Sequence, residues 1–291
     1  MILMTGATGL AGSAIAAEFV RQGQAVRLLV RDRAKAAKLT GAPALDIVDG
    51  DMARPDTLGA ALDGVERVLM ISGPDARMVE TQCTFIDAAK AAGVRHIIKF
   101  SGLDARKDAL FRFVRMHKEV EEHLEASGLR WTHLGPAGFM QVYLREALTI
   151  ADGVLALALS DIRLSPVDLA DVAKVAFLLL RDGGHESEWL PMTGPEALTM
   201  GEIAEHVSRA VGRPVRYFPV SPAERRDILL ARGVPPDFAD ALDEQVAERL
   251  KGGAESRIDL STHAAFGIAP TRFAAFAMRH ASDFKGERRA A

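Results

Sequence analysis

The first twelve residues, Met1-Ile2-Leu3-Met4-Thr5-Gly6-Ala7-Thr8-Gly9-Leu10-Ala11-Gly12, decide the fold. The apolar start predicts a short buried strand, and the spaced glycines mark a turn into a helix. The first glycine permits a tight turn, the second lets backbone N–H groups approach a phosphate, and the third lets the helix pack closely on the strand. Because unpaired N–H groups and the helix dipole favour negative charge at a helix N-terminus, this stretch predicts a diphosphate-binding loop. We expect the ligand to contact Gly6, Thr8, Gly9, Leu10, Ala11 and Gly12.

The residues that follow this loop strengthen the prediction. Residues 10–22 place apolar side chains on one helical face, Gly23 ends the predicted helix, and residues 25–30 predict a second strand. Three spaced glycines alone occur by chance, whereas a strand, a glycine turn, a helix and a second strand in this order form the unit that binds dinucleotides. A strand-turn-helix without a ligand is the alternative interpretation.

The composition is that of an ordinary folded protein. With 48% hydrophobic and 26% charged residues, the 291-residue chain can bury one large core, or a core with a smaller lobe. The net charge of −3 gives no reason to expect nucleic acid as a partner. The apolar start leads straight into the glycine turn, which does not fit a signal peptide, and no apolar run reaches the ~18 to 20 residues of a membrane span.

The cysteines and histidines predict neither disulfides nor a metal. The single cysteine, Cys83, excludes an internal disulfide framework and is most simply a small buried side chain. His117 and His123 do not share a helix face, and the sequence has no His-x-x-x-His pair. We expect a cytoplasmic enzyme or sensor with a small-molecule ligand, no metal, and neither membrane nor nucleic acid as partner. The sequence leaves a homodimer open.

The residues after the second strand bear on the choice of coenzyme. In dinucleotide-binding folds the end of this strand faces the adenosine ribose, where a carboxylate would bind hydroxyl groups and a guanidinium would bind a 2′-phosphate. Arg31 comes first and favours NADP(H), whereas Asp32 would select NAD(H) if the strand ran one residue longer. We predict NADP(H) over NAD(H), with Arg31 as the phosphate ligand, and we assign Lys38 to a solvated helix face.

Further strand ends complete the predicted crevice. Four more strands alternate with helices, and this alternation implies right-handed crossovers and a doubly wound parallel sheet; they are predicted within residues 45–48, 65–71, 96–102 and 129–134. In such a sheet the ligand binds outside the carboxyl ends of the strands. We therefore expect Asp51 and Met52 beside the adenine, and Ile71, Ser72 and Gly73 along the middle of the coenzyme.

The regular alternation loosens from Gly135 onward. Residues 135–140 contain glycine and proline yet carry large apolar side chains, as expected of a pocket wall. We assign Phe139, Met140 and Tyr143 to the substrate pocket, with core packing as the alternative for Met140. The fold class is α/β, a Rossmann-type doubly wound parallel sheet with a smaller, mostly helical C-terminal lobe. We expect an NAD(P)-binding domain of residues 1–144 and 166–194, and a small substrate-binding lobe of residues 145–165 and 195–291.

Several segments resemble atypical short-chain dehydrogenase/reductases of the NmrA-like group: residues 5–12, 27–32, 117–121, 127–132, 168–173 and 193–199. The similarity covers most of the chain to about residue 220, and the nearest relatives are those of the NAD(P)H:quinone oxidoreductase branch. The resemblance implies a Rossmann domain with NADP(H), and either quinone reduction or redox sensing without turnover.

The chain departs from this family at the proton donor. Classical short-chain dehydrogenase/reductases use a tyrosine and a lysine four residues apart to move a proton, and this chain has Phe113 and His117 at those places. Because phenylalanine cannot donate a proton, ketone reduction by the usual route is not expected. A histidine here, with Glu121 four residues further on, is similar to the quinone-reductase branch.

Three residues are candidates for the chemistry. A quinone is already electrophilic, so its reduction needs a positioned nicotinamide and a proton from water or a nearby acid. We predict His117 as that acid, because imidazole titrates near neutrality; the alternative is a half-buried structural histidine. Lys99 is expected either to bind the nicotinamide ribose or to extend to the edge of the sheet, and Ser101 either to bind ribose or substrate or to cap the following loop.

Two functions fit these residues. The first is an NADPH-dependent oxidoreductase that transfers a hydride to a quinone or a similar flat electrophilic acceptor. The second is a non-catalytic NADP(H)-binding redox sensor that acts through a protein partner. Phe113 favours the sensor, whereas the apolar loop and a lobe large enough to enclose a substrate favour the enzyme, which we predict.

Overall fold

Seven strands form one sheet with the strand order of a dinucleotide-binding fold. The order is β3-β2-β1-β4-β5-β6-β8. The strands are β1 (Ile2–Met4), β2 (Val26–Val30), β3 (Leu45–Asp49), β4 (Arg67–Met70), β5 (His96–Phe100), β6 (Arg130–Pro136) and β8 (Glu188–Met192). The computed structural model describes residues 1–36 and 41–287, so Lys38 and residues 288–291 lie outside the described residues.

The strands from β3 to β6 pair in parallel, and the order reverses beside β1. Leu3 of β1 lies opposite Arg27 of β2 and Val68 of β4. The Thr5 hydroxyl fixes this junction, because it donates to the carbonyl of Ile71 at 2.6 Å and accepts from the N–H of Ile71 at 2.8 Å. The predicted doubly wound sheet is confirmed, and its switch point lies at the glycine loop.

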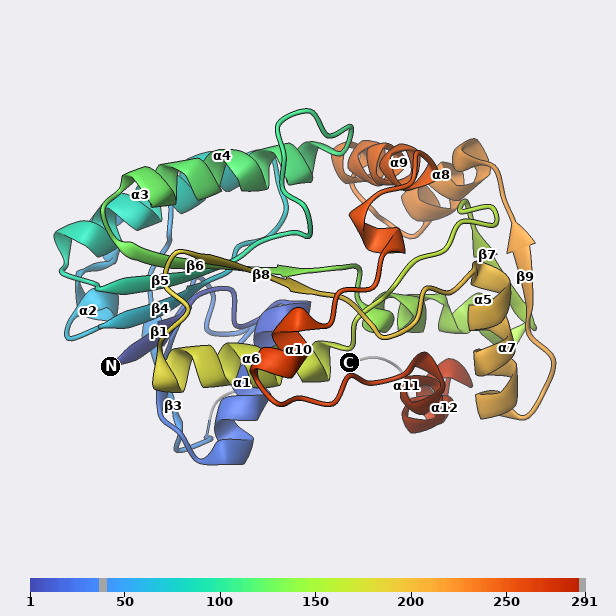
Figure 1. The fold of residues 1–291 in the computed structure, drawn as a ribbon, viewed down its shortest axis with the longest axis horizontal. Coiled ribbons are helices and arrows are strands. Elements are labelled where there is room, and N and C mark those ends of the chain that lie inside the picture. The colour runs from blue at the N-terminus through green and yellow to red at the C-terminus, as the bar shows by residue number, and fades with distance from the viewer. Residues whose placement is uncertain (37–40, 288–291) are drawn as a thin grey trace. The chain divides into compact units, whose positions relative to one another are not determined.

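Helices cover both faces of this sheet (Figure 1). α3 (Met78–Ala91) and α4 (Arg112–Ala126) lie on one face, and α1 (Leu10–Gln22) and α6 (Leu169–Asp182) lie on the other. On the first face, Phe85 and Leu124 pack in one buried cluster with Ile97 of β5. On the second, the ring of Phe19 meets the ring of Phe177 edge-on at 5.0 Å. Removing this apolar surface from water holds the helices on the sheet.

The chain divides into two compact units whose boundaries differ from the predicted ones. The first unit comprises residues 1–107, 113–135 and 172–190, and the second comprises residues 108–112, 136–171 and 191–291. Four segments that we assigned to the Rossmann domain therefore fall in the second unit: residues 108–112, 136–144, 166–171 and 191–194. The physical reason is packing, because Met140 and Tyr143 belong to the core of the second unit.

The second unit is mostly helical, as predicted, with a small sheet of its own. Its core contains Ile203 and Phe276, both fully buried. β7 and β9 pair in parallel, with Val154 opposite Arg216. The elements are η3 (Met140–Glu146), α5 (Ala147–Ala151), β7 (Val154–Leu157), α7 (Met200–Val211), β9 (Arg216–Pro219), α8 (Pro222–Ala231), α9 (Pro236–Leu250), η4 (Ala254–Ser256), α10 (Ser261–Ala265), α11 (Phe273–Arg279) and α12 (Ala281–Phe284).

The remaining connections of the first unit are short. Between β3 and β4 lie η2 (Pro55–Thr57) and α2 (Gly59–Leu62).

Within residues 1–36 and 41–287, no helix is both long enough and apolar enough to cross a membrane.

Gly12 makes the tightest approach in the glycine loop. A Cβ atom at Gly12 would lie 2.1 Å from the carbonyl oxygen of Gly6, whereas a Cβ atom at Gly9 would lie 3.4 Å from that oxygen. We predict that Gly12→Ala lowers the free energy of unfolding by about 2 to 3 kcal/mol, because α1 must move away from the loop. Chemical denaturation measures the loss. Gly9→Ala is the matched control and should cost less than about 1 kcal/mol; equal losses would contradict the packing argument.

Candidate active site

The glycine loop presents free backbone donors at the carboxyl end of β1. Gly6 adopts a left-handed conformation with φ of 66°, and a Cβ atom there would lie 2.8 Å from the carbonyl oxygen of Ile71. Gly9 is the N-cap of α1 and no side chain caps this end of the helix. The first N–H groups of a helix have no acceptor within the helix, so those of Leu10, Ala11 and Gly12 are available to an anion. Thr8 beside them is exposed.

The end of β4 supplies the opposite side of the switch point. Ile71 is tied to β1 through Thr5, and Ser72 and Gly73 follow it. The amide of Gln82, on α3, donates to the Ser72 hydroxyl at 2.8 Å, although Gln82 is buried. This bond orients Ser72 beside the glycine loop, as expected of a residue along the middle of a dinucleotide.

The end of β2 separates the two candidates for the adenosine ribose. The strand ends at Val30, and Arg31 is the first residue beyond it and is exposed. The Asp32 carboxylate is hydrogen-bonded within its own turn, because it accepts the N–H of Ala34 at 2.9 Å. Arg33 is paired with Asp49 at 2.7 Å. Arg31 therefore stays the predicted ligand of the 2′-phosphate in this turn.

The end of β3 carries the two residues predicted for the adenine pocket. The carboxylate of Asp51 accepts the N–H of Ala53 at 3.0 Å and shapes the turn after the strand. Met52 is 92% buried and packs with Leu29 and Leu58, so it is part of the core at this strand end.

A network of four polar side chains lies at the carboxyl end of β5. Lys99 is completely buried, and its ammonium group lies 2.8 Å from Nδ1 of His117 and 3.1 Å from the Ser101 hydroxyl. Ser101 in turn donates to the carboxylate of Glu121 at 2.6 Å. Lys99 and Ser101 are two residues apart on a strand, and His117 and Glu121 are one helical turn apart, so each pair faces the same way. The structure thus brings all three predicted catalytic residues together.

The network has unusual electrostatics because Lys99, Ser101 and Glu121 are buried. Burial lowers the pKa of Lys99 to about 7, against the opposing pull of the Glu121 carboxylate. Burial raises the pKa of Glu121, while the hydrogen bond from Ser101 and the charge of Lys99 act in the other direction. An ammonium group near neutral pKa can release its proton at physiological pH.

His117 does not titrate near neutrality, which corrects the premise of its predicted role. Burial, with the charge of Lys99 as the next cause, lowers its pKa well below 6.5. The imidazole is therefore neutral at pH 7. Because an ammonium group can only donate, Nδ1 of His117 accepts from Lys99 and the ring carries its proton on Nε2. His117 can act as a neutral donor rather than as an imidazolium acid.

The predicted substrate-pocket residues lie in the second unit, and two of them are buried in its core. Met140 is 1% exposed and Tyr143 is 5% exposed, and both belong to the core of that unit. The Tyr143 ring meets Phe273 edge-on at 5.5 Å, and its hydroxyl points at the sulfur of Met200. Phe139 is partly exposed and keeps its predicted assignment. The large apolar side chains of this loop were a signal of core packing.

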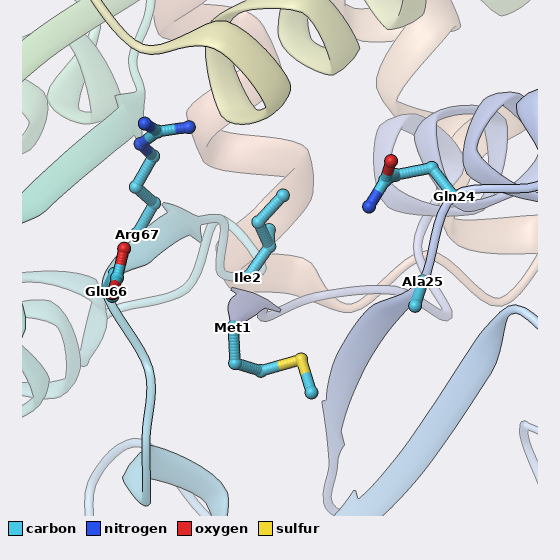
Figure 2. A pocket seen from close by; sticks show the side chains of 6 residues that line it. All are labelled: Met1, Ile2, Gln24, Ala25, Glu66 and Arg67. Atoms are coloured by element: carbon cyan, nitrogen blue, oxygen red, sulfur yellow. The ribbon is translucent and has the colours of Figure 1, made fainter.

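A hollow of about 280 Å³ opens at the other end of the strands (Figure 2). Its lining residues lie at or before the amino ends of β1, β2 and β4: Met1, Ile2, Gln24, Ala25, Glu66 and Arg67. The Arg67 guanidinium already donates to the carbonyls of Leu180 and Arg181 at the end of α6. Since parallel sheets bind ligands at the carboxyl ends of their strands, this hollow is not the coenzyme site.

Glu121 also forms a carboxylate and imidazole cluster with Glu125 and His133, whose ligand atoms lie within 4.8 Å of one another. Two of its three members already have partners within the protein. Nε2 of His133 lies 3.1 Å from Glu125, and the Lys118 ammonium lies 3.8 Å from Glu121. A lysine in this position supplies the positive charge that a cation would bring.

Three residues of this site had no role assigned from the sequence. The role of Thr5 follows from its place directly after β1, which a closer reading of the strand end would have shown. Glu121 was noticed for its spacing from His117, and that spacing was the signal that it belongs to the network. Gln82 lies in the middle of α3 and nothing in its surrounding sequence marks it.

The fold and this site define a class, that of Rossmann-type dinucleotide-binding proteins with a buried polar network beside the ligand edge of the sheet. Residues 1–267 match the model of the NmrA-like family, and the chain therefore belongs to that family. The predicted family is confirmed.

Several reductases are similar to the chain over almost its whole length. It is 35% identical to the NAD(P)H azoreductase of Xenophilus azovorans, over 98% of this chain and 99% of that one. It is 31% identical to quinone oxidoreductase 2 of Escherichia coli, over 87% and 89% of the two chains. The crystal structure of the NADPH-dependent quinone oxidoreductase QOR2 from Escherichia coli, complexed with NADPH, superimposes with a TM-score of 0.84 at 28% identity and covers 96% of this chain and 99% of that one.

We predict that the imidazole of His117 stays neutral at pH values well below 6.5, the usual pKa of histidine. NMR titration of the histidine ring signals measures this pKa. Lys99→Met should raise it, because the variant removes the cation that opposes protonation of the ring. Lys118→Met removes a lysine from the same helix and should leave the His117 titration unchanged. A His117 pKa at or above 6.5 in the wild-type protein would contradict the assigned geometry.

Proposed function

We propose that this protein is an NADPH-dependent oxidoreductase that reduces quinones or similarly flat electrophilic acceptors. The observation that carries the proposal is the Lys99–His117 contact at the carboxyl end of β5, at the same edge of the sheet as the glycine loop. It places a proton source on the edge where a dinucleotide binds. The azoreductase and quinone oxidoreductase relatives support the class of acceptor.

NADP(H) is the coenzyme that the residues fit. The diphosphate would bind the free N–H groups of Leu10, Ala11 and Gly12, and the 2′-phosphate would pair with Arg31. Ser72 and Gly73 would lie along the middle of the coenzyme. The bound coenzyme supplies a hydride. The residues of the chain hold it in place and provide the proton that completes the reduction.

The acceptor class agrees with the residues at the proton-donor position. Phe113 is 6% exposed and has no ionisable group, so the tyrosine route is absent at this position. A quinone or an azo group delocalises the charge that a hydride brings, so a neutral imidazole N–H is a sufficient donor. The single cysteine, Cys83, supports the proposed reducing, cytoplasmic setting. Dimerisation stays a prediction.

Steady-state oxidation of NADPH over a panel of quinones and azo compounds tests the proposal. We expect acceptor-dependent turnover, and we expect Gly9→Ala to lose it, because the added methyl group blocks the approach of the diphosphate while the loop still folds. Binding of NADPH without turnover on any acceptor would favour the sensor and refute the enzyme. Absence of NADPH binding would refute both.

Coenzyme choice gives a separate prediction. Arg31→Asp should weaken NADPH binding about 10- to 100-fold, because a charge-assisted pair with the 2′-phosphate is replaced by repulsion, and should leave NADH binding nearly unchanged. Isothermal titration with both coenzymes measures the difference. Asp32→Ala is the control, since its carboxylate is held by Ala34 and should not affect either coenzyme. Equal losses for NADPH and NADH in Arg31→Asp would refute the assignment.

A further inference from the structure

Lys99 is a buried amine whose proton has a defined path, through the ring of His117, to the carboxyl edge of the sheet. Its ammonium group contacts Nδ1 of His117 at 2.8 Å, and the opposite side of that ring, which carries Nε2, lies beside Gly102. A Cβ atom at Gly102 would lie only 3.2 Å from Cδ2 of His117, so the glycine keeps this side of the ring uncovered by a side chain. The two ring nitrogens thus connect the buried ammonium group of Lys99 to the loop after β5.

We propose that Lys99 is the proton reservoir of the reaction and delivers its proton through His117, and that Glu121, acting through Ser101, is the residue that positions Lys99. This inference rests on the proposed function and extends it to the path of the proton.

The step balances without any further reactant. The acceptor gains a hydride, which is two electrons and one hydrogen nucleus, from the coenzyme. It then takes the proton on Nε2 of His117, while Nδ1 takes one proton from Lys99, and the ring remains neutral throughout. The step leaves Lys99 as a neutral amine and the ring as its other neutral tautomer, with the proton on Nδ1. Uptake of a solvent proton on Nε2 and return of the Nδ1 proton to Lys99 restore both groups before the next turnover. A histidine that never becomes charged is the form that its buried position favours.

Glu121 holds the lysine from the other side. Lys99 donates to the Ser101 hydroxyl at 3.1 Å, and Ser101 donates to Oε1 of Glu121 at 2.6 Å. Glu121 is 2% exposed, and its other oxygen faces Lys118 at 3.8 Å. The carboxylate therefore stabilises the charged form of Lys99 without taking its proton directly, because the serine stands between them.

The groups around Lys99 determine the expected pH dependence. They are Glu121 and His117 on α4, Cys83 on α3 and His133, opposite Lys99 on β6. Burial lowers the pKa of Lys99 to about 7 and both Glu121 and Cys83 act to raise it. The donating form is the ammonium, so the rate of acceptor reduction should fall as the pH rises through about 7.

Single-turnover oxidation of bound NADPH by a quinone, followed by stopped flow at several pH values, tests the relay. Lys99→Met should reduce the rate about 100-fold at pH 6 and remove its pH dependence, with unchanged NADPH affinity. Lys90→Met is the control, because it removes an exposed lysine from the last turn of α3, outside the network, and it should keep the wild-type rate and profile. A wild-type profile and rate in Lys99→Met would overturn the relay.

Glu121→Gln tests the positioning role. The glutamine keeps an oxygen for the Ser101 hydroxyl but removes the charge that favours the ammonium form of Lys99. The midpoint of the rate profile should therefore move to lower pH, whereas the rate at the acidic limit should stay within about 3-fold of the wild type. A purely structural role would lower the rate at every pH without moving the midpoint, and that result would overturn the assignment.

A nitrogen-15 NMR measurement of His117 separates failure of the relay from failure of the proposed function. It needs no turnover. The relay requires an unprotonated Nδ1 whose signal changes in Lys99→Met; a proton resident on Nδ1 would overturn it. If the wild-type protein turns over but Lys99→Met behaves like it, the relay fails and the function stands. If no acceptor is reduced, the proposed function fails and the relay loses its role with it.

Discussion

The lack of a side chain at Gly12 is the constraint on which the rest of the first unit depends. With a carbonyl oxygen 2.1 Å from where a Cβ atom would lie, α1 can begin directly behind the loop, and its free N–H groups end up at the carboxyl end of β1. Gly6 brings the same loop against Ile71, directly after β4. Two close approaches thus place the anion-binding end of a helix at the point where the strand order reverses, which is where open parallel sheets bind ligands.

The buried lysine is harder to explain by stability. An ammonium group without water costs free energy, and a paired charge inside a protein is commonly no more stabilising than apolar packing of the same volume. The neighbouring side chains offset this cost, with hydrogen bonds from Lys99 to His117 and Ser101. Since β5 is otherwise an apolar strand apart from His96 at its start, a lysine at its carboxyl end is better explained by chemistry at that edge.

The parts that local sequence determines were predictable. The glycine loop, the alternation of strands and helices and the end of β2 before Arg31 all follow from short-range patterns, and the sheet order follows from crossover rules. The unit boundaries were not predictable, because they depend on which core Met140 and Tyr143 join. The sequence shows that Lys99 and Ser101 share one face and that His117 and Glu121 share another. That the two faces meet is a tertiary fact, and the lowered pKa of His117 depends on that meeting.

The proton chemistry and the class of acceptor constrain each other. A ketone that receives a hydride places a full negative charge on one oxygen. A neutral imidazole is a weak proton donor to that oxygen unless a stronger acid protonates the imidazole in turn. A quinone or an azo compound spreads that charge over a conjugated system, which lowers the demand on the donor. Phe113 stands where a tyrosine would donate the proton, and the neutral His117 is in contact with Lys99. The site is therefore suited to acceptors that are electrophilic without activation by a strong acid. The same residues that exclude one chemistry therefore favour the other.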